Sequence, residues 1–172
     1  MLYQEKDLDM TICIISMDGD FSKIEKTKKT SEFLAKKYPV IGVIPESKTV
    51  MPASLPVYQG GNCVTSMIDK AMNECKSDWA YIVFAGSVMK KQIDKKLSYY
   101  VEKKQDVLFP VVDRIYNFIT GSMNGILMNK EFYHEVGEFG SGNSLQDTKV
   151  LWAEKALNKG VKFKAIVNAC NI

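Results

Sequence analysis

Short apolar runs rich in β-branched residues recur along this chain, and segments with helical periodicity separate them. The runs "TICIIS" (11–16), "VIGVI" (40–44) and "WAYIVF" (79–84) are typical of buried strands. Between them we predict helices over 22–37 and 63–76, the second from its apolar residues at helical spacing. Buried strands that alternate with helices predict an α/β fold: a three-layer α/β/α sandwich with a mostly parallel mixed sheet.

The second half of the chain continues this alternation. We predict a surface helix over 91–104, strands over 106–112 and 121–129, a short helix from Lys130 stopped by Gly137, a last helix over 146–158 and a closing strand over 161–167. The chain is long enough for one domain with its own core, and we expect a single domain over 1–172 with residues 1–9 as an N-terminal extension.

Three loops follow the predicted strands at the sheet edge where such folds bind ligands. They cover 17–21, 45–62 and 85–90. The stretch 45–61 holds three prolines and the pair Gly60-Gly61, so we predict a long loop there with a role in function.

Net charge, cysteine spacing and apolar runs limit the kinds of partner and the cellular compartment that we expect. The net charge of +3 is too small to favour nucleic acid, which is bound by a clustered basic face. The four cysteines lie far apart and form no C-x-x-C pair, and we recognise no signal peptide, so we expect a cytoplasmic protein. No apolar run is long enough for a membrane span.

The stretch "GVIPESKT" (42–49) is one residue short of a phosphate-binding P-loop, G-x-x-x-x-G-K-[ST]. Ser47 stands where the second glycine is needed for the backbone to wrap phosphates. The motif also needs a helix directly after it, and the prolines of "VMPASLP" prevent one. We therefore reject a P-loop.

Two consecutive stretches in the second half carry a family resemblance. "GSMNGILMNKEFYHEVGEF" and "LQDTKVLWAEKALNKGVKFKAI" follow the order of the inverting family 2 glycosyltransferases: a strand, a short helix with a Gly-x-Phe, an acidic pair that opens a helix, and a glycine before the last strand. The chain resembles this family over about residues 10–168. The resemblance implies the GT-A fold and a nucleotide-diphosphate sugar donor, a UDP-sugar first among them.

The resemblance implies a nucleotide site at the first two strand ends. Glu46 and Ser47 match the polar loop that contacts the base, and a carboxylate there can accept a hydrogen bond from an imide N–H. Ser16 and Asp18 match the first-strand loop. The competing interpretation of these residues is a polar loop with turn and capping roles.

The resemblance also implies a catalytic base. Asp147 matches the second acid of the family's pair, which takes a proton from the acceptor hydroxyl. The first acid is replaced by Gln146. The alternative is that Asp147 only favours the helix N-terminus electrostatically.

The family's metal motif is missing. Members carry D-x-D after the strand that matches 79–84, and these carboxylates hold Mn²⁺ or Mg²⁺ against the diphosphate. Here the stretch reads "AGSV" (85–88), and the only histidine, His134, lies elsewhere. We expect Gly86 and Ser87 to approach the diphosphate, with Asp113 and Arg114 near the sugar and phosphates, and Lys90 or Lys91 as further cations. We assign no metal ligands, although Mn²⁺ or Mg²⁺ stays open.

Two functions remain open from the sequence. The first is an inverting glycosyltransferase that lacks the D-x-D metal motif and acts on an unknown acceptor. The second is a degenerate GT-A scaffold that has lost catalysis and serves as a binding or structural module. A receiver-like α/β domain ranks last because the strand over 79–84 ends without an aspartate. Family members carry a further C-terminal segment for the acceptor, so we expect a homo-oligomer or a partner subunit to supply that part.

Overall fold

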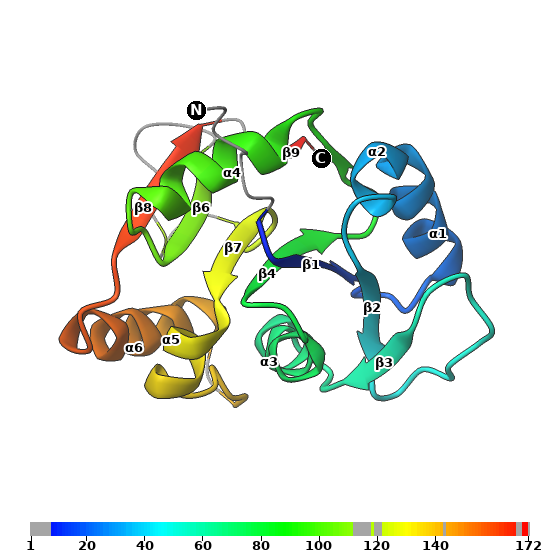
Figure 1. Ribbon diagram of the computed structural model, residues 1–172. Helices are drawn as coiled ribbons and strands as arrows, with labels where there is room; N and C mark the ends of the chain where they lie inside the picture. The colour runs from blue at the N-terminus through cyan, green and yellow to red at the C-terminus, as the bar shows by residue number, and fades with distance from the viewer. Residues whose placement is uncertain (1–7, 112–117, 119–121, 143, 168–169, 172) are drawn as a thin grey trace, which may run out of the picture.

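The computed structural model describes residues 8–111, 118, 122–142, 144–167 and 170–171. Its main sheet has seven strands in the order β3-β2-β1-β4-β7-β6-β8, and Figure 1 shows their arrangement. The strands are β1 Met10–Ile15, β2 Val40–Pro45, β3 Val57–Gly60, β4 Trp79–Phe84, β6 Val107–Val111, β7 Ile126–Asn129 and β8 Phe163–Val167. Neighbouring strands pair in parallel, except that β7 is antiparallel to β4 and β6. The predicted mostly parallel mixed sheet is confirmed.

Helices cover both faces of this sheet. In Figure 1, α1, α2 and α4 lie on one face, and α3, α5 and α6 lie on the other. The helices are α1 Phe21–Thr30, α2 Glu32–Ala35, α3 Val64–Glu74, α4 Ile93–Glu102, α5 Lys130–Val136 and α6 Leu145–Asn158. The predicted three-layer sandwich is therefore confirmed.

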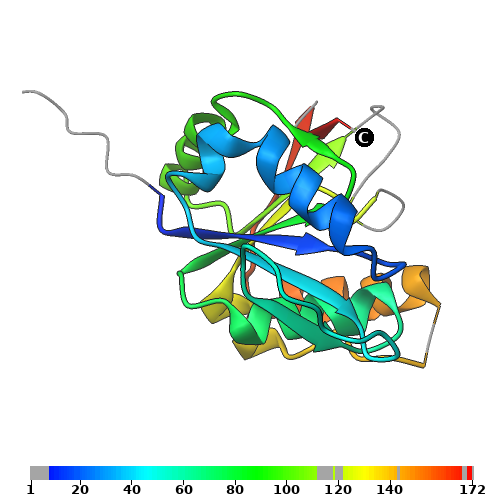
Figure 2. The same cartoon turned by 90° about the vertical axis from the view of Figure 1, so that its right-hand side faces the viewer.

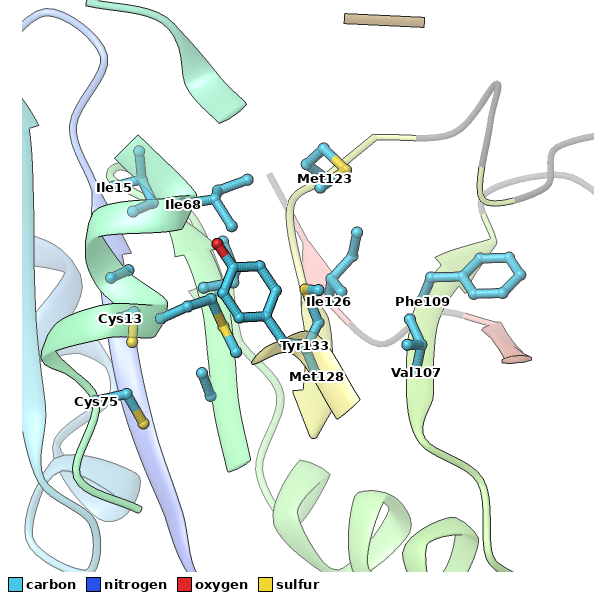
Figure 3. Packing of buried hydrophobic residues seen from close by; sticks show 14 of the residues in the cluster. Cys13, Ile15, Ile68, Cys75, Val107, Phe109, Met123, Ile126, Met128 and Tyr133 are labelled. Atoms are coloured by element: carbon cyan, nitrogen blue, oxygen red, sulfur yellow. The ribbon is translucent and has the colours of Figure 1, made fainter. Parts of the chain in front are cut away.

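Each face of the sheet has its own hydrophobic core because successive strand side chains point to opposite faces. In β1, Cys13 and Ile15 join the core under α3, α5 and α6, whereas Ile12 and Ile14 join the core under α1, α2 and α4. Figure 3 shows side chains from β1, α3 and β7 gathered around the buried ring of Tyr133.

The helix predicted over 22–37 is two helices. It breaks at Ser31, where the backbone leaves the helical region with φ −113° and ψ 29°. The Ser31 hydroxyl is fully buried and has no hydrogen-bond partner among the described residues. Leu34 of α2 packs into the core beyond the break, so tertiary packing overrides a continuous helical pattern.

The loop predicted over 45–61 contains a strand. β3 adds a four-residue edge strand parallel to β2, and prolines just before it concealed the pattern. A side chain at Gly60 would meet the backbone of Met67 at 2.9 Å, so glycine lets α3 pack closely on this strand. The strand predicted over 121–129 covers only Ile126–Asn129 within the described residues.

A small second sheet also escaped the sequence analysis. It pairs β5, Val88–Met89, with β9, Cys170–Asn171, in antiparallel register. Two-residue strands carry no periodic signal, so pattern reasoning does not find them.

Residues 8 and 9 are in contact with the rest of the domain. Leu8 is buried and Asp9 accepts hydrogen bonds from the backbone N–H groups of Asp78 and Trp79, so this part of the predicted extension packs on the domain. None of the described helices is long and apolar enough to cross a lipid bilayer.

Candidate nucleotide-binding site

The carboxyl ends of β1 and β4 lie side by side, with Ile15 paired to Phe84 in the strand register. A cavity of about 260 Å³ lies just beyond these ends, and we call it the Ser16 cavity. Its polar lining residues are Ser16, Asp18, Lys23, Ser87 and Asn124. Ile15, Met17, Phe84 and Ala85 complete the lining. The topology thus places hydroxyls, one carboxylate, one amide and one ammonium at the sheet edge where α/β folds bind ligands.

Asp18 is the centre of the hydrogen bonds on the β1 side of the cavity. Its Oδ1 accepts from the Ser16 hydroxyl and from the Asp20 backbone N–H, both at 3.0 Å. Its Oδ2 forms an ion pair with the Lys23 ammonium. The bonds from Lys23 and from the Asp20 backbone lower the pKa of Asp18 to about 2. Asp18 is therefore a carboxylate at neutral pH, and its charge is matched by Lys23.

Asp20 shares the D-x-D spacing with Asp18, but its carboxylate caps α1. Its Oδ1 accepts from the backbone N–H of Ser22 at 2.8 Å and from the Ser22 hydroxyl at 2.6 Å. An aspartate at this position satisfies one of the free N–H groups that begin a helix. The stretch "MDGD" therefore encodes the turn and cap that begin α1.

Asn124 organises the β4 side of the cavity. Its Oδ1 accepts from the Phe84 backbone N–H at 2.8 Å, and its Nδ2 donates to the Ser87 hydroxyl at 2.9 Å. Both Ser87 and Asn124 are buried. No local pattern in the sequence marks Asn124, because its role depends on β7 lying antiparallel to β4. The stretch 121–129 predicts a strand or a strand and turn, which assigns Asn124 no role at a site.

The Gly86 backbone N–H is already engaged. It donates to the Thr27 hydroxyl at 2.8 Å, and that hydroxyl donates to the Lys23 carbonyl at 2.9 Å. The family resemblance predicts that this turn approaches a diphosphate. Instead the Gly86 N–H ties the turn after β4 to the first turns of α1, and Gly86 does not line the Ser16 cavity. The positive φ of 95° explains the glycine.

A second cavity of about 490 Å³ lies between the ends of β2 and β3 and the side of α3, and we call it the Glu46 cavity. Glu46, Gly61, Lys70, Glu138 and Ser141 are among its lining residues. Glu46 is exposed here. It therefore lies at a sheet-edge cavity, but a different one from that of Ser16, Asp18 and Ser87.

Ser47 is exposed, and its backbone N–H donates to the Asn62 side-chain oxygen at 3.1 Å. The next residue, Lys48, joins the two loops: its side chain packs over Gly19, so loops 17–20 and 46–49 are in contact. Two of the three predicted loops therefore meet, although Glu46 and Asp18 line separate cavities.

Asp69 forms a buried polar cluster that sequence reasoning did not find. Its carboxylate accepts from the Tyr133 hydroxyl and from the backbone N–H groups of Phe139 and Gly140, the latter two at 2.8 Å. Burial raises the pKa of Asp69 despite these bonds. The Thr65 hydroxyl also donates to the Gly140 carbonyl at 2.8 Å. These contacts fix the segment before α6 against α3.

Asp147 lies in the first turn of α6. Figure 2 shows the start of this helix at the end of the sandwich toward which β1 points. Its backbone N–H donates to the Ser144 side chain at 3.1 Å, and Ser144 is the helix cap. The Asp147 side chain is exposed and lines neither cavity described above. Its role as a base stays a prediction. Asp113 and Arg114 lie outside the described residues.

The described residues do not fit a divalent cation of the D-x-D kind. Such a cation needs several free oxygen ligands, carboxylates above all. Among the described residues that line the Ser16 cavity, Asp18 is the sole carboxylate, and it is paired with Lys23. No group of three His, Cys, Asp or Glu residues suited to a metal occurs within the described part of the chain.

Comparison with known proteins identifies the fold. No family model and no curated protein sequence matches this chain. Among solved structures, a mannosyltransferase from Pyrobaculum calidifontis, in complex with GDP-Man and Mn²⁺, superposes with a TM-score of 0.69 at 12% identity. The match covers 95% of this chain and 57% of that chain. The fold is that of the GT-A-like glycosyltransferases.

A second neighbour supports the same fold. TarS of S. aureus, as a fragment of residues 1–349, superposes with a TM-score of 0.61 at 11% identity. The match covers 92% of this chain and 58% of that fragment. The chain thus spans a little over half the length of either neighbour, and the identity is too low to transfer their substrates.

Proposed function

We propose that this protein binds a nucleotide-diphosphate sugar at the carboxyl ends of β1 and β4 and transfers the sugar, with inversion, to an unknown acceptor. The observation that carries the proposal is the Ser16 cavity, which lies where the fold's sheet edge receives ligands and combines hydroxyl, amide and ammonium groups. Apolar Met17 and Phe84 supply contact area beside these groups. A GT-A-like fold supports the reaction class.

The roles follow from the chemistry of each group. Ser16 and Asp18 contact the nucleotide, Ser87 approaches its diphosphate, and Glu46 with Ser47 contacts the base from the neighbouring loop. Asp147 takes the proton of the acceptor hydroxyl while its oxygen attacks the anomeric carbon. The bond from that carbon to the phosphate oxygen breaks on the opposite face, and the nucleoside diphosphate leaves with the electron pair.

A second function is favoured by a specific observation. The turn after β4 has no carboxylate, and its Gly86 N–H is bonded to Thr27. A scaffold that retained the fold but lost catalysis would show the same turn. In that case the protein binds a nucleotide or a protein partner without transferring sugar.

Calorimetry with UDP, GDP, CMP and their sugars, in EDTA and in Mn²⁺, tests the proposal. We expect binding in EDTA that weakens in Glu46→Ala. The exposed Glu135 of α5, which carries the same charge, provides the control Glu135→Ala. Failure of every nucleotide to bind would overturn the proposed function and leave the scaffold interpretation.

Hydrolysis of the bound nucleotide sugar separates the two functions. We expect wild-type protein to release nucleoside diphosphate slowly in water, because water can replace the acceptor. Asp147→Asn should abolish this release without weakening nucleotide binding. Equal release by both proteins would refute the role of Asp147, and no release by wild type, with binding intact, would favour the scaffold.

A further inference from the structure

Lys23 is the one cation among the described residues that line the Ser16 cavity. Its importance rests on the proposed function, because a diphosphate carries several negative charges and its charge increases as it departs. Enzymes of this kind commonly stabilise that charge with a metal ion. The described residues here do not fit such an ion. Another positive group must therefore face the phosphates.

The backbone of Lys23 is anchored next to the turn that replaces the metal motif. The Thr27 hydroxyl joins the two by donating to the Lys23 carbonyl and accepting from the Gly86 N–H. Lys23 lies in the first turn of α1, and that helix begins at the carboxyl edge of the sheet. The Lys23 side chain thus extends from a point beside the turn that stands where the family carries D-x-D.

The Lys23 ammonium is held at the cavity but not enclosed. It pairs with Asp18, and the two side chains are 49% and 53% exposed. The hydrogen bond to Asp18 raises the pKa of Lys23, so the group stays positive at neutral pH. Exposed ion pairs contribute little free energy, so an incoming phosphate can draw the ammonium away from Asp18 at small cost.

We propose that Lys23 takes the place of the metal ion: its ammonium binds the donor diphosphate in the Ser16 cavity, and Asp18 is a positioning residue that holds the ammonium there beforehand. Asp18 repels the phosphates less than a free carboxylate would, because the Ser16 hydroxyl and the Asp20 N–H still donate to it when the ammonium turns to the phosphate. During transfer the ammonium keeps its proton and stabilises the phosphate oxygen that receives the electron pair.

The test compares Lys23→Gln, Lys23→Arg and Lys29→Gln. Lys29 is an exposed lysine of the same helix that lines a different cavity, so Lys29→Gln changes the charge equally away from the site. The probes are UDP and GDP against uridine and guanosine, titrated calorimetrically in EDTA. Circular dichroism confirms that each variant is folded.

We expect Lys23→Gln to weaken nucleoside diphosphate binding about tenfold, the size expected for one lost charge-assisted hydrogen bond. Lys23→Arg should restore most of the affinity, and Lys29→Gln should bind as wild type. Binding of the nucleosides should not change, because they lack the phosphates. Higher salt should weaken wild-type binding more than that of Lys23→Gln.

Three results would overturn the inference. Equal diphosphate affinity for wild type and Lys23→Gln would refute it while leaving the proposed function intact. Wild-type binding that EDTA abolishes and Mn²⁺ restores would show a metal site instead. Absence of binding of both diphosphates to wild type would remove the proposed function itself.

Discussion

The side chain of Lys48 lies across Gly19, so that a Cβ built on Gly19 would come within 2.5 Å of the Lys48 Cγ. This contact joins the loop after β1 to the loop after β2, and Gly19 itself has a φ of +71°. The loop after β1 borders the Ser16 cavity, because Asp18 lines it. Two independent constraints therefore require glycine at this position: backbone conformation and close approach.

Gly19→Ala should lower the free energy of unfolding by about 2–3 kcal/mol, because it adds both left-handed strain and a clash with Lys48. Gly160→Ala is the matched control. Gly160 has a φ of +82° with no atom within 4 Å of a built Cβ, so that variant adds strain alone. Urea unfolding of both variants gives the comparison. Equal losses would show that the Lys48 contact costs nothing.

Asp69→Asn should destabilise the protein by about 2–4 kcal/mol at neutral pH, because the amide cannot accept all three donors of the buried cluster. Tyr133→Phe removes one donor and leaves the carboxylate two backbone partners, so it should cost less. Chemical denaturation monitored by tryptophan fluorescence measures both. A greater loss in Tyr133→Phe would contradict this interpretation of the cluster.

The contribution of Asp69 to the free energy of unfolding should also depend on pH. Burial raises the pKa of Asp69 above the unfolded value of 3.8, so the folded state binds more protons in the window between the two values. The contribution of Asp69 is therefore fully present below about pH 4 and declines as pH rises through the raised pKa. The difference in unfolding free energy between wild type and Asp69→Asn should fall over that window.

The contribution of Asp18 to the free energy of unfolding should change with pH in the opposite direction. Its folded pKa of about 2 lies below the unfolded value of 3.8, so its contribution is present above pH 3.8 and is lost as pH falls toward 2. Both partners of the Asp18–Lys23 pair are half-exposed, so we expect less than about 1 kcal/mol. Unfolding of wild type and Asp18→Asn at pH 5 and pH 2.5 measures it. A difference that grows toward low pH would contradict the sign.

Ser31→Ala should stabilise the protein, by about 1 kcal/mol. The substitution removes a buried hydroxyl without a partner among the described residues, and it leaves no new polar group behind. Thermal unfolding provides the measurement, with Ser22→Ala as a contrast. Ser22 donates to the Asp20 carboxylate at the start of α1, so that variant should not be stabilised.

Several elements could be predicted from local sequence because their residues interact with near neighbours. The alternation along β1 places Ile12 and Ile14 on one face and Cys13 and Ile15 on the other, and the periodicity of α3 selects its buried side. The turn "MDGD" could be predicted in the same way, whereas the cap of α1 is Asp20 and not Ser22, where the sequence placed the start of the helix. β3, the break at Ser31 and the small second sheet could not be found in this way, because each depends on packing against distant residues.

By itself, then, the sequence determined a mostly parallel α/β sandwich, the loops at its sheet edge and the absence of a carboxylate motif after β4, since periodicity and residue identity are local properties. Only the tertiary structure decided which loop residues share a cavity. It brought Asn124, in the turn before β7, to Ser87 and bound Gly86 to Thr27, while Glu46 lines a separate cavity. These relationships arise from strand order and helix packing, which set distances between residues far apart in the chain.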